Sequence, residues 1–124
     1  MADDDYEDTE LLEVAIMKIE PGVNLHKVKT GRAVLEYLTY QSDNDLPCLI
    51  ILDYNMPELT GSEVLSIICN DQRYEDIPKV ILSTSNTPHH IRECMQNGAT
   101  GYFVKPNNMH DLIGLAKKML DYCS

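Results

Sequence analysis

Short apolar runs alternate along the chain with longer segments in which apolar residues recur every three or four positions. The runs at 49–52, 80–82 and 101–104 are too short for helices and rich in aliphatic side chains, so they predict strands. The longer segments, such as 11–19 and 109–120, place apolar residues on one face and predict amphipathic helices. Strands that alternate with helices predict βα units, a parallel sheet and an α/β fold.

The beginning of the chain departs from this alternation. The segment 23–28 alternates only in part and predicts a weak strand at an edge of the sheet. No apolar run precedes the first predicted helix, because the chain opens with the letters MADDD. Six of the first ten residues are acidic, which indicates either a solvated terminus or a Mg²⁺ site built from carboxylate oxygens.

A lone carboxylate follows the best-defined strand. Four aliphatic residues at 49–52 predict a strand buried on both faces, and Asp53 comes directly after it. Pro57 then prevents the strand from continuing. In an open α/β sheet, ligands bind beyond the carboxyl ends of the strands, so Asp53 stands where chemistry is expected. The alternative is a turn or helix cap, a common use of aspartate after a strand.

Two further strands end in polar side chains of complementary chemistry. The run at 80–82 leads into Ser83, and the run at 101–104 leads into Lys105, which precedes a proline. A carboxylate, a hydroxyl and an ammonium at one sheet edge suit an acyl phosphate, since the carboxylate attacks phosphorus and the other two hold the transferred oxygens. Each residue alone has an ordinary explanation, but the joint pattern favours this chemistry.

Composition narrows the class of protein. With 124 residues, 44% of them hydrophobic, the chain has the size and composition of one globular domain. A net charge of −10 argues against direct nucleic-acid binding, and the absence of a bilayer-length run or leader predicts a cytoplasmic protein without membrane insertion. The four cysteines show no metal-ligand spacing; we expect Cys69 and Cys94 in the core and Cys123 as a reactive surface thiol.

The ordered motifs resemble the receiver domains of two-component response regulators over nearly the whole chain. The features that carry the resemblance are the acidic pair Asp3-Asp4, Asp53 followed by Asn55-Met56-Pro57 and Gly61, Ser83, and Lys105-Pro106. The resemblance implies one receiver domain over residues 1–124. It also implies a flavodoxin-like, three-layer α/β/α fold around a parallel sheet of strand order 2-1-3-4-5.

The resemblance implies a phosphoacceptor and a metal site. Asp53 would accept a phosphoryl group from a phosphohistidine on a histidine kinase or histidine phosphotransfer protein. Asp4, Asp53 and the backbone carbonyl of Asn55 would bind Mg²⁺, with Mn²⁺ as a substitute and Asp3 as a supporting acid.

The resemblance also implies a switch. Ser83 and Lys105 would hold the phosphoryl oxygens, and Tyr102 is similar to the aromatic whose rotamer reports phosphorylation. Ser83 and Tyr102 would therefore change together and alter the binding of a downstream protein. By the same resemblance, we expect a cis peptide bond between Lys105 and Pro106.

The first strand is the main departure from the family pattern. In the 2-1-3-4-5 order this strand is central, yet here it is truncated or absent, leaving four to five strands. Three explanations are open: a fragment of a longer protein, direct pairing of the two neighbouring strands, or a strand supplied by another molecule. The first is favoured, and unpaired edges are expected to promote a homodimer or strand swapping.

The leading hypothesis is a phosphorylation-controlled signalling receiver rather than an enzyme, capable of catalysing its own phosphorylation and dephosphorylation. One alternative is a degenerate receiver that acts only as a protein-interaction module. A less favoured alternative is an aspartyl-phosphate phosphatase, because such enzymes usually carry a second acid two residues after the nucleophile, where this chain has Asn55.

Overall fold

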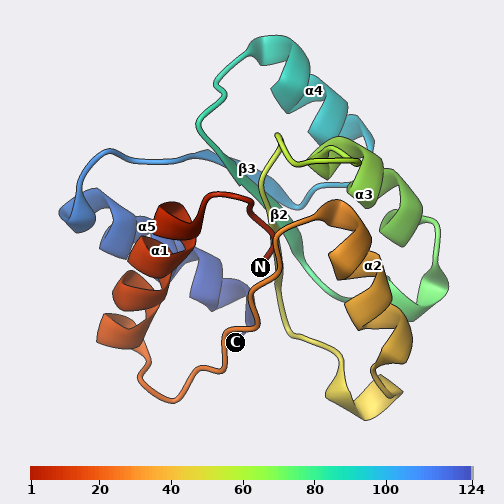
Figure 1. Ribbon diagram of the computed structural model, residues 1–124, viewed down its shortest axis with the longest axis horizontal. Helices are drawn as coiled ribbons and strands as arrows, with labels where there is room; N and C mark the ends of the chain where they lie inside the picture. The colour runs from red at the N-terminus through yellow and green to blue at the C-terminus, as the bar shows by residue number, and fades with distance from the viewer. Residues whose placement is uncertain (124) are drawn as a thin grey trace.

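A parallel sheet with helices on both faces organises the molecule in the computed structural model, which describes residues 1–123 (Figure 1). Strands β1, β2 and β3 pair in that order, with Ile51 opposite Val80 and Ile81 opposite Tyr102. The helices and strands, in chain order, are α1 (Tyr6–Ile19), α2 (Gly31–Tyr40), β1 (Ile50–Leu52), α3 (Gly61–Cys69), β2 (Lys79–Ser83), α4 (Pro88–Gln96), β3 (Gly101–Val104) and α5 (Met109–Leu120).

Two apolar clusters cover the two faces of the sheet. Helices α1 and α5 lie together on one face, where residues such as Ile16 and Ala116 pack against Ile51 and Val80. Helices α2 and α3 cover the other face, where Leu65 belongs to the cluster that includes Leu52. This three-layer arrangement is the predicted flavodoxin-like α/β fold.

The central first strand is reduced to a single bridging residue. Ala2 forms parallel bridges with Leu52 on one side and with Val28 on the other. The Asp3 N–H donates to the Val28 carbonyl oxygen (3.0 Å), and the Asp53 N–H donates to that of Ala2 (2.9 Å). Direct pairing of the two neighbouring strands is therefore wrong. In the predicted weak strand at 23–28 only Val28 forms a bridge, and the His26 carbonyl oxygen accepts a hydrogen bond from the Met1 ammonium group.

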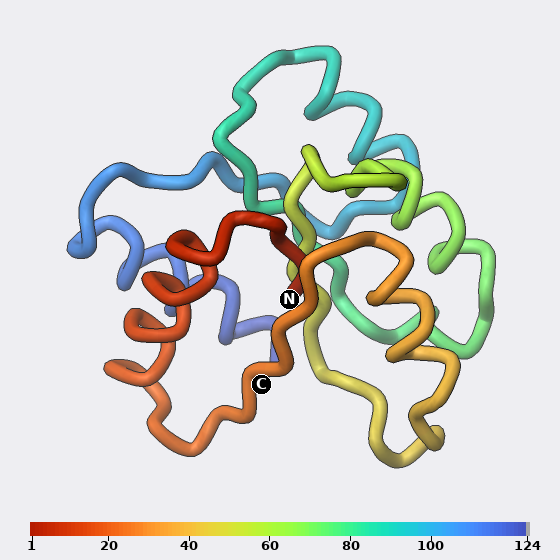
Figure 2. Tube along the Cα trace, in the orientation of Figure 1, coloured from red at the N-terminus to blue at the C-terminus, as the bar shows by residue number. Residues whose placement is uncertain are grey.

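An apolar groove continues the line of this short strand, where Figure 2 shows the chain start between two longer segments. It has a volume of about 220 Å³ and is lined by residues that include Leu25, Val34, Leu38 and Ile50. In a parallel ladder the next rung would be formed by the Ile51 N–H, which points to this side of β1. The groove thus combines apolar walls with a strand edge that has no protein partner there among the described residues.

A close backbone approach fixes the turn after β1. A Cβ at position 61 would lie 2.4 Å from the Asp53 carbonyl oxygen, so this position requires glycine. Gly61 opens α3, and its N–H donates to the Tyr54 carbonyl oxygen at 2.8 Å. The helix start is secured by a capping box between Thr60 and Glu63. The segment after Asp53 is therefore held against the end of the strand.

Several local expectations are wrong. The described chain contains no cis peptide bond, so the bond between Lys105 and Pro106 is trans. Cys123 is not a free thiol, because it forms a disulfide with Cys48 across a separation of 75 residues. Cys69 is exposed at the last position of α3, whereas Cys94 is buried as expected. Among residues 1–123, no helix has both the length and the apolar character needed to cross a membrane.

Candidate functional site

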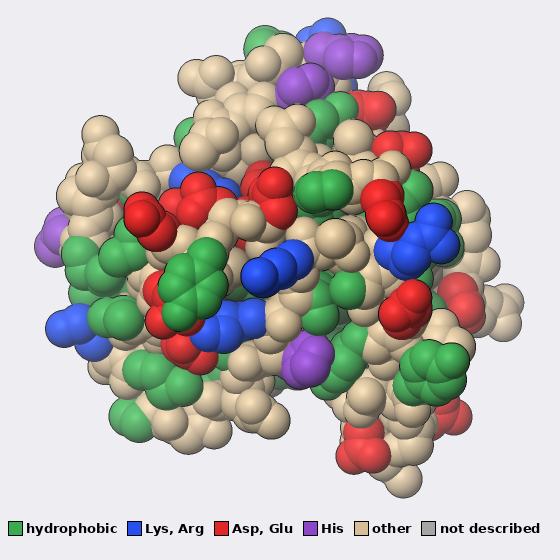
Figure 3. All heavy atoms as spheres, viewed as in Figure 1, with side chains coloured by type: hydrophobic (Ala, Val, Ile, Leu, Met, Phe, Trp, Pro, Cys, Tyr) green, Lys and Arg blue, Asp and Glu red, His purple; other side chains and the backbone are tan. Residues whose placement is uncertain are grey.

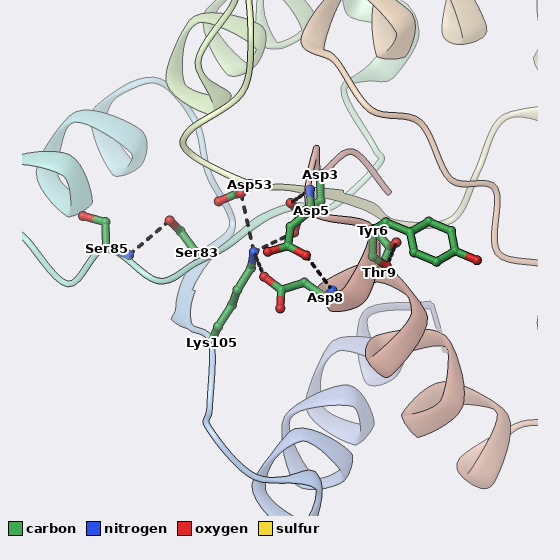
Figure 4. Close-up of polar contacts among 9 residues, drawn as sticks. All are labelled: Asp3, Asp5, Tyr6, Asp8, Thr9, Asp53, Ser83, Ser85 and Lys105. Atoms are coloured by element: carbon green, nitrogen blue, oxygen red, sulfur yellow. Dashed lines mark hydrogen bonds and ion pairs between the residues drawn. The ribbon is translucent and has the colours of Figure 1, made fainter.

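A nearly buried ammonium group lies at the centre of a carboxylate cluster at the carboxyl edge of the sheet (Figure 4). The Lys105 Nζ lies 2.6 Å from Asp3 Oδ2 and 2.7 Å from Asp8 Oδ2. It lies 3.5 Å from Asp53 Oδ2. The predicted proximity of Lys105 to Asp53 is confirmed, and the acids come from the start of the chain and from the end of β1.

Burial and charge act in opposite directions on Lys105. Burial by itself would lower the pKa of its ammonium group, since desolvation disfavours a charge. Hydrogen bonds to Asp3 and Asp8, with the nearby charge of Asp53, outweigh burial and raise that pKa above its ordinary value. Lys105 therefore remains charged at neutral pH.

The Asp3 carboxyl is more deeply buried than its neighbours. Burial raises its pKa, and the charge of Asp53 acts in the same direction. Hydrogen bonds from Lys105 and from the Asp5 N–H, which lies 2.9 Å from Asp3 Oδ1, offset this only in part. Because two carboxylates repel at this edge, the site favours a cation.

Three carboxylates form a set of oxygen ligands. One oxygen each from Asp3, Asp4 and Asp53 lie within 4.8 Å of one another. Asp4 is exposed, and acidic side chains gather over the start of α1 and the loop before it (Figure 3). Oxygen-only ligands suit Mg²⁺ or Mn²⁺, so these residues fit such an ion. Asn55 lies exposed in the turn after β1, and the role of its carbonyl stays a prediction.

Ser83 is fully buried at the end of β2 and lies at the same sheet edge. Its Oγ accepts a hydrogen bond from the Ser85 N–H (3.2 Å), while its carbonyl oxygen accepts one from the Lys105 N–H (2.8 Å). The Tyr102 hydroxyl donates to the Ser85 carbonyl oxygen (2.7 Å). Both predicted switch residues are thus held at Ser85, and no hydrogen bond joins the Ser83 side chain to Asp53 within the described part of the chain.

A second polar group beside Asp53 was not predicted. The Tyr54 hydroxyl donates to Glu93 Oε2 (2.5 Å), and its ring stacks on that of His90 with centroids 4.0 Å apart. His90 Nδ1 lies 2.7 Å from Ser85 Oγ. The hydrogen bond to Glu93, together with burial, raises the pKa of Tyr54 to about 12. These contacts connect α4 to the segments that follow β1 and β2.

Asp8 was also missed by the sequence reasoning. Its position three residues after Asp5, the N-cap of α1, indicates a helix start and nothing more. Only the packing of α1 against α5 brings its carboxylate to Lys105, which is 97 residues away in the chain. The acidic opening was a signal for this region, but it did not single out Asp8.

The chain is similar in sequence to plant two-component response regulators. The Arabidopsis thaliana two-component response regulator ARR15 is 35% identical over 117 residues, covering 89% of this chain and 56% of that protein. Rice ORR11, from Oryza sativa subsp. indica, is 36% identical over 93 residues, covering 75% and 61%. The chain thus spans little more than half the length of ARR15.

Solved structures of response regulators are similar to this chain in fold. The phosphorylated cyanobacterial phytochrome response regulator RcpA superposes with a TM-score of 0.87 at 28% identity, covering 98% of this chain and 89% of that one. The Mn²⁺-bound form of response regulator Rcp1 gives 0.81 at 26% identity, covering 97% and 88%. The sequence model described as the response regulator receiver domain matches residues 1–117, so this chain belongs to the response regulator receiver family of two-component signalling.

Proposed function

We propose that this protein accepts a phosphoryl group on Asp53 from a histidine kinase or a histidine phosphotransfer protein. The observation that carries the proposal is the placement of the Asp53 carboxylate at the end of β1, 3.5 Å from Lys105 and inside the acidic cluster. In this reaction an Asp53 oxygen forms a bond to phosphorus while the bond from phosphorus to the donor's histidine nitrogen breaks.

We assign the metal site to Asp4, Asp53 and the Asn55 carbonyl, with Asp3 in support. A bound Mg²⁺ or Mn²⁺ would neutralise the charge that the carboxylates and the phosphoryl oxygens bring together. The fit rests on the oxygen-only set of Asp3, Asp4 and Asp53. Two further roles fall to the protein itself. Lys105 holds a phosphoryl oxygen, and the main chain around residues 53–61 orients the nucleophile.

Phosphorylation is proposed to act through Ser83 and Tyr102. A phosphoryl group adds negative charge and acceptor oxygens at the strand ends, which attract the Ser83 hydroxyl. Moving Ser83 breaks its hydrogen bond from Ser85, and Ser85 also accepts from Tyr102 and contacts His90. The change would reach α4 and β3 and alter the binding of a downstream protein. The proposed setting is the cytoplasm.

The test is incubation with acetyl phosphate and Mg²⁺, followed by intact mass measurement. We expect the addition of one phosphoryl group to the wild-type chain and none to Asp53→Asn. Asp45→Asn, which removes an exposed carboxylate that is not part of the acidic cluster, serves as the matched control and should be labelled normally. Label that persists in Asp53→Asn would move the acceptor elsewhere. An unlabelled wild-type chain would favour the degenerate interaction module, and rapid release of inorganic phosphate on continued turnover would favour a phosphatase.

A further inference from the structure

We propose that Asp8 sets the resting position of the Lys105 ammonium group and is the carboxylate that releases it when Asp53 is phosphorylated. Asp8 is thereby a positioning residue, because it acts through Lys105 and does not contact the reacting atoms. The inference rests on the proposed function and adds to it a residue that regulates the same site.

The first step concerns the number of donors. An ammonium group has three protons to donate, and Lys105 directs them at three carboxylates. The two short contacts, to Asp3 and Asp8, hold the ammonium group on the α1 side of the site (Figure 4). The contact to Asp53 is the longest, at 3.5 Å. A phosphoryl group on Asp53 lies on the side of this longest contact, so Lys105 moves away from one of its two short partners when it approaches a phosphoryl oxygen.

The second step identifies which partner yields. The Asp3 side chain is fully buried (0% exposed), so losing Lys105 would leave its charge without a counter-ion away from water. Asp53 carries the phosphoryl group itself. The Asp8 side chain is 32% exposed, so water can replace the ammonium group there. Asp8 is thus the carboxylate that Lys105 leaves at the smallest loss of free energy.

The third step is the consequence for the fold. Asp8 lies in the first turn of α1, where its own N–H donates to Asp5 Oδ1 at 3.2 Å. This cap keeps the backbone of Asp8 in place when its carboxylate loses Lys105. Phosphorylation would therefore remove a side-chain link between α1 and the segment after β3, without melting the helix.

The experiment compares Asp8→Asn with Glu7→Gln, which removes an exposed charge from the same turn and leaves the described contacts of Lys105 unchanged. Acetyl phosphate donates the phosphoryl group; an Asp53 oxygen bonds to phosphorus as the donor's P–O bond breaks, and acetate leaves with the electron pair. We expect Asp8→Asn to be labelled several-fold faster than Glu7→Gln, and Asp8→Glu to restore the wild-type rate. In the Lys105→Met background, Asp8→Asn and Glu7→Gln should have the same effect. An Asp8→Asn gain that persists without Lys105, or no gain over Glu7→Gln, would overturn the proposal.

A second readout does not depend on the Lys105→Met variant. In NMR spectra of lysine side chains labelled at Cε, the Lys105 signal of unphosphorylated Asp8→Asn should move toward its position in the phosphorylated wild-type chain. In Glu7→Gln it should stay. A signal that does not move in Asp8→Asn overturns the role of Asp8 alone, whereas absence of label in every variant overturns the proposed function and the release step with it.

Discussion

The carboxyl and amino ends of the sheet each bury a lysine, but they surround it differently. At the carboxyl end, Lys105 meets the three carboxylates of Asp3, Asp8 and Asp53. At the amino end, Lys79 at the start of β2 is 5% exposed, and its Nζ donates to the Tyr74 carbonyl oxygen at 2.6 Å. Burial of a lysine therefore does not by itself mark a functional site; the charges of its partners do.

At the amino end, one ammonium group is bound by a neutral acceptor, and Lys79 forms no ion pair within residues 1–123. The carboxyl end gathers several charges whose balance a cation or a phosphoryl group can change. We infer that the charges at the carboxyl end of the sheet serve function. The apolar groove at the amino end lowers the free energy of unfolding.

The largest expected effect tests the two lysines directly. Lys105→Met leaves buried carboxylates without a counter-ion and should lower the free energy of unfolding by about 3–5 kcal/mol. Lys79→Met leaves only a carbonyl oxygen without its partner and should change it by about 1 kcal/mol. Urea unfolding with and without Mg²⁺ measures both, and Mg²⁺ should restore only Lys105→Met. Equal losses in the two variants, with no dependence on Mg²⁺, would refute the comparison.

The next effect concerns the groove at the amino end. Adding four aliphatic residues ahead of Met1 should continue the central strand, bury apolar surface and supply ladder hydrogen bonds, for a gain of about 2–4 kcal/mol. Such an extension should also raise Mg²⁺ affinity, because it anchors Asp3 and Asp4 on a longer strand. Thermal unfolding and calorimetry measure these changes, with an extension of four serine and glycine residues as the control.

The aliphatic extension is also expected to change the oligomeric state of the chain. Since the strand edges beside the groove have no partner among residues 1–123, we expect the chain to self-associate and the aliphatic extension to favour the monomer. Analytical ultracentrifugation decides this point. A present chain that is monomeric and as stable as the extended one would show that a single bridging residue is sufficient to complete the sheet.

The third effect belongs to the acidic cluster. Saturating Mg²⁺ relieves repulsion among Asp3, Asp4 and Asp53 and should stabilise the folded chain by about 2–3 kcal/mol at a hundredfold excess over its dissociation constant. Chelation should reverse the gain, and zinc should not be required. Asp4→Asn should lose most of the gain, whereas Asp76→Asn, at an exposed position on another loop, should keep it. Calorimetry that detects no divalent ion binding to an extended, stable chain would contradict the assignment.

The sequence predicted what depends on local signals. Asp53, Ser83 and Lys105 each follow a short apolar run, and strand ends of a parallel sheet meet at one edge, so their common location could be inferred. Contacts set by packing could not be inferred in this way. Asp8 reaches Lys105 only through the placement of α1 against α5, and the disulfide from Cys48 joins segments 75 residues apart.

The first strand is a second feature that the sequence could not predict. One residue has no periodicity, so Ala2 could not be recognised as a strand, although its bridges to Val28 and Leu52 hold the central position. The residues around Tyr54 were missed for a related reason. His90 is half-buried against the Tyr54 ring because α4 packs there, and no local pattern in the sequence indicates this contact.

The smallest effect concerns this aromatic group beside Asp53. Tyr54→Phe removes the hydrogen bond to Glu93 and should cost about 1 kcal/mol at pH 8. The pKa of Tyr54 is about 12 in the folded chain, above its ordinary value of 10, so the unfolded chain loses the phenolic proton first as the pH rises. The contribution of Tyr54 is therefore complete below pH 10 and is lost between pH 10 and 12.

Urea unfolding of the wild-type chain and Tyr54→Phe at pH 8 and near pH 11 should show the difference between them shrinking at the higher pH. Tyr40→Phe is the control, because Tyr40 is 85% exposed and should show no such convergence. Equal stability of the two chains at both pH values would mean that Tyr54 stabilises the chain through ring packing on His90, which phenylalanine retains. In that case the hydroxyl group would contribute little to holding α4, and the link from Asp53 to α4 would run through the stacked rings instead.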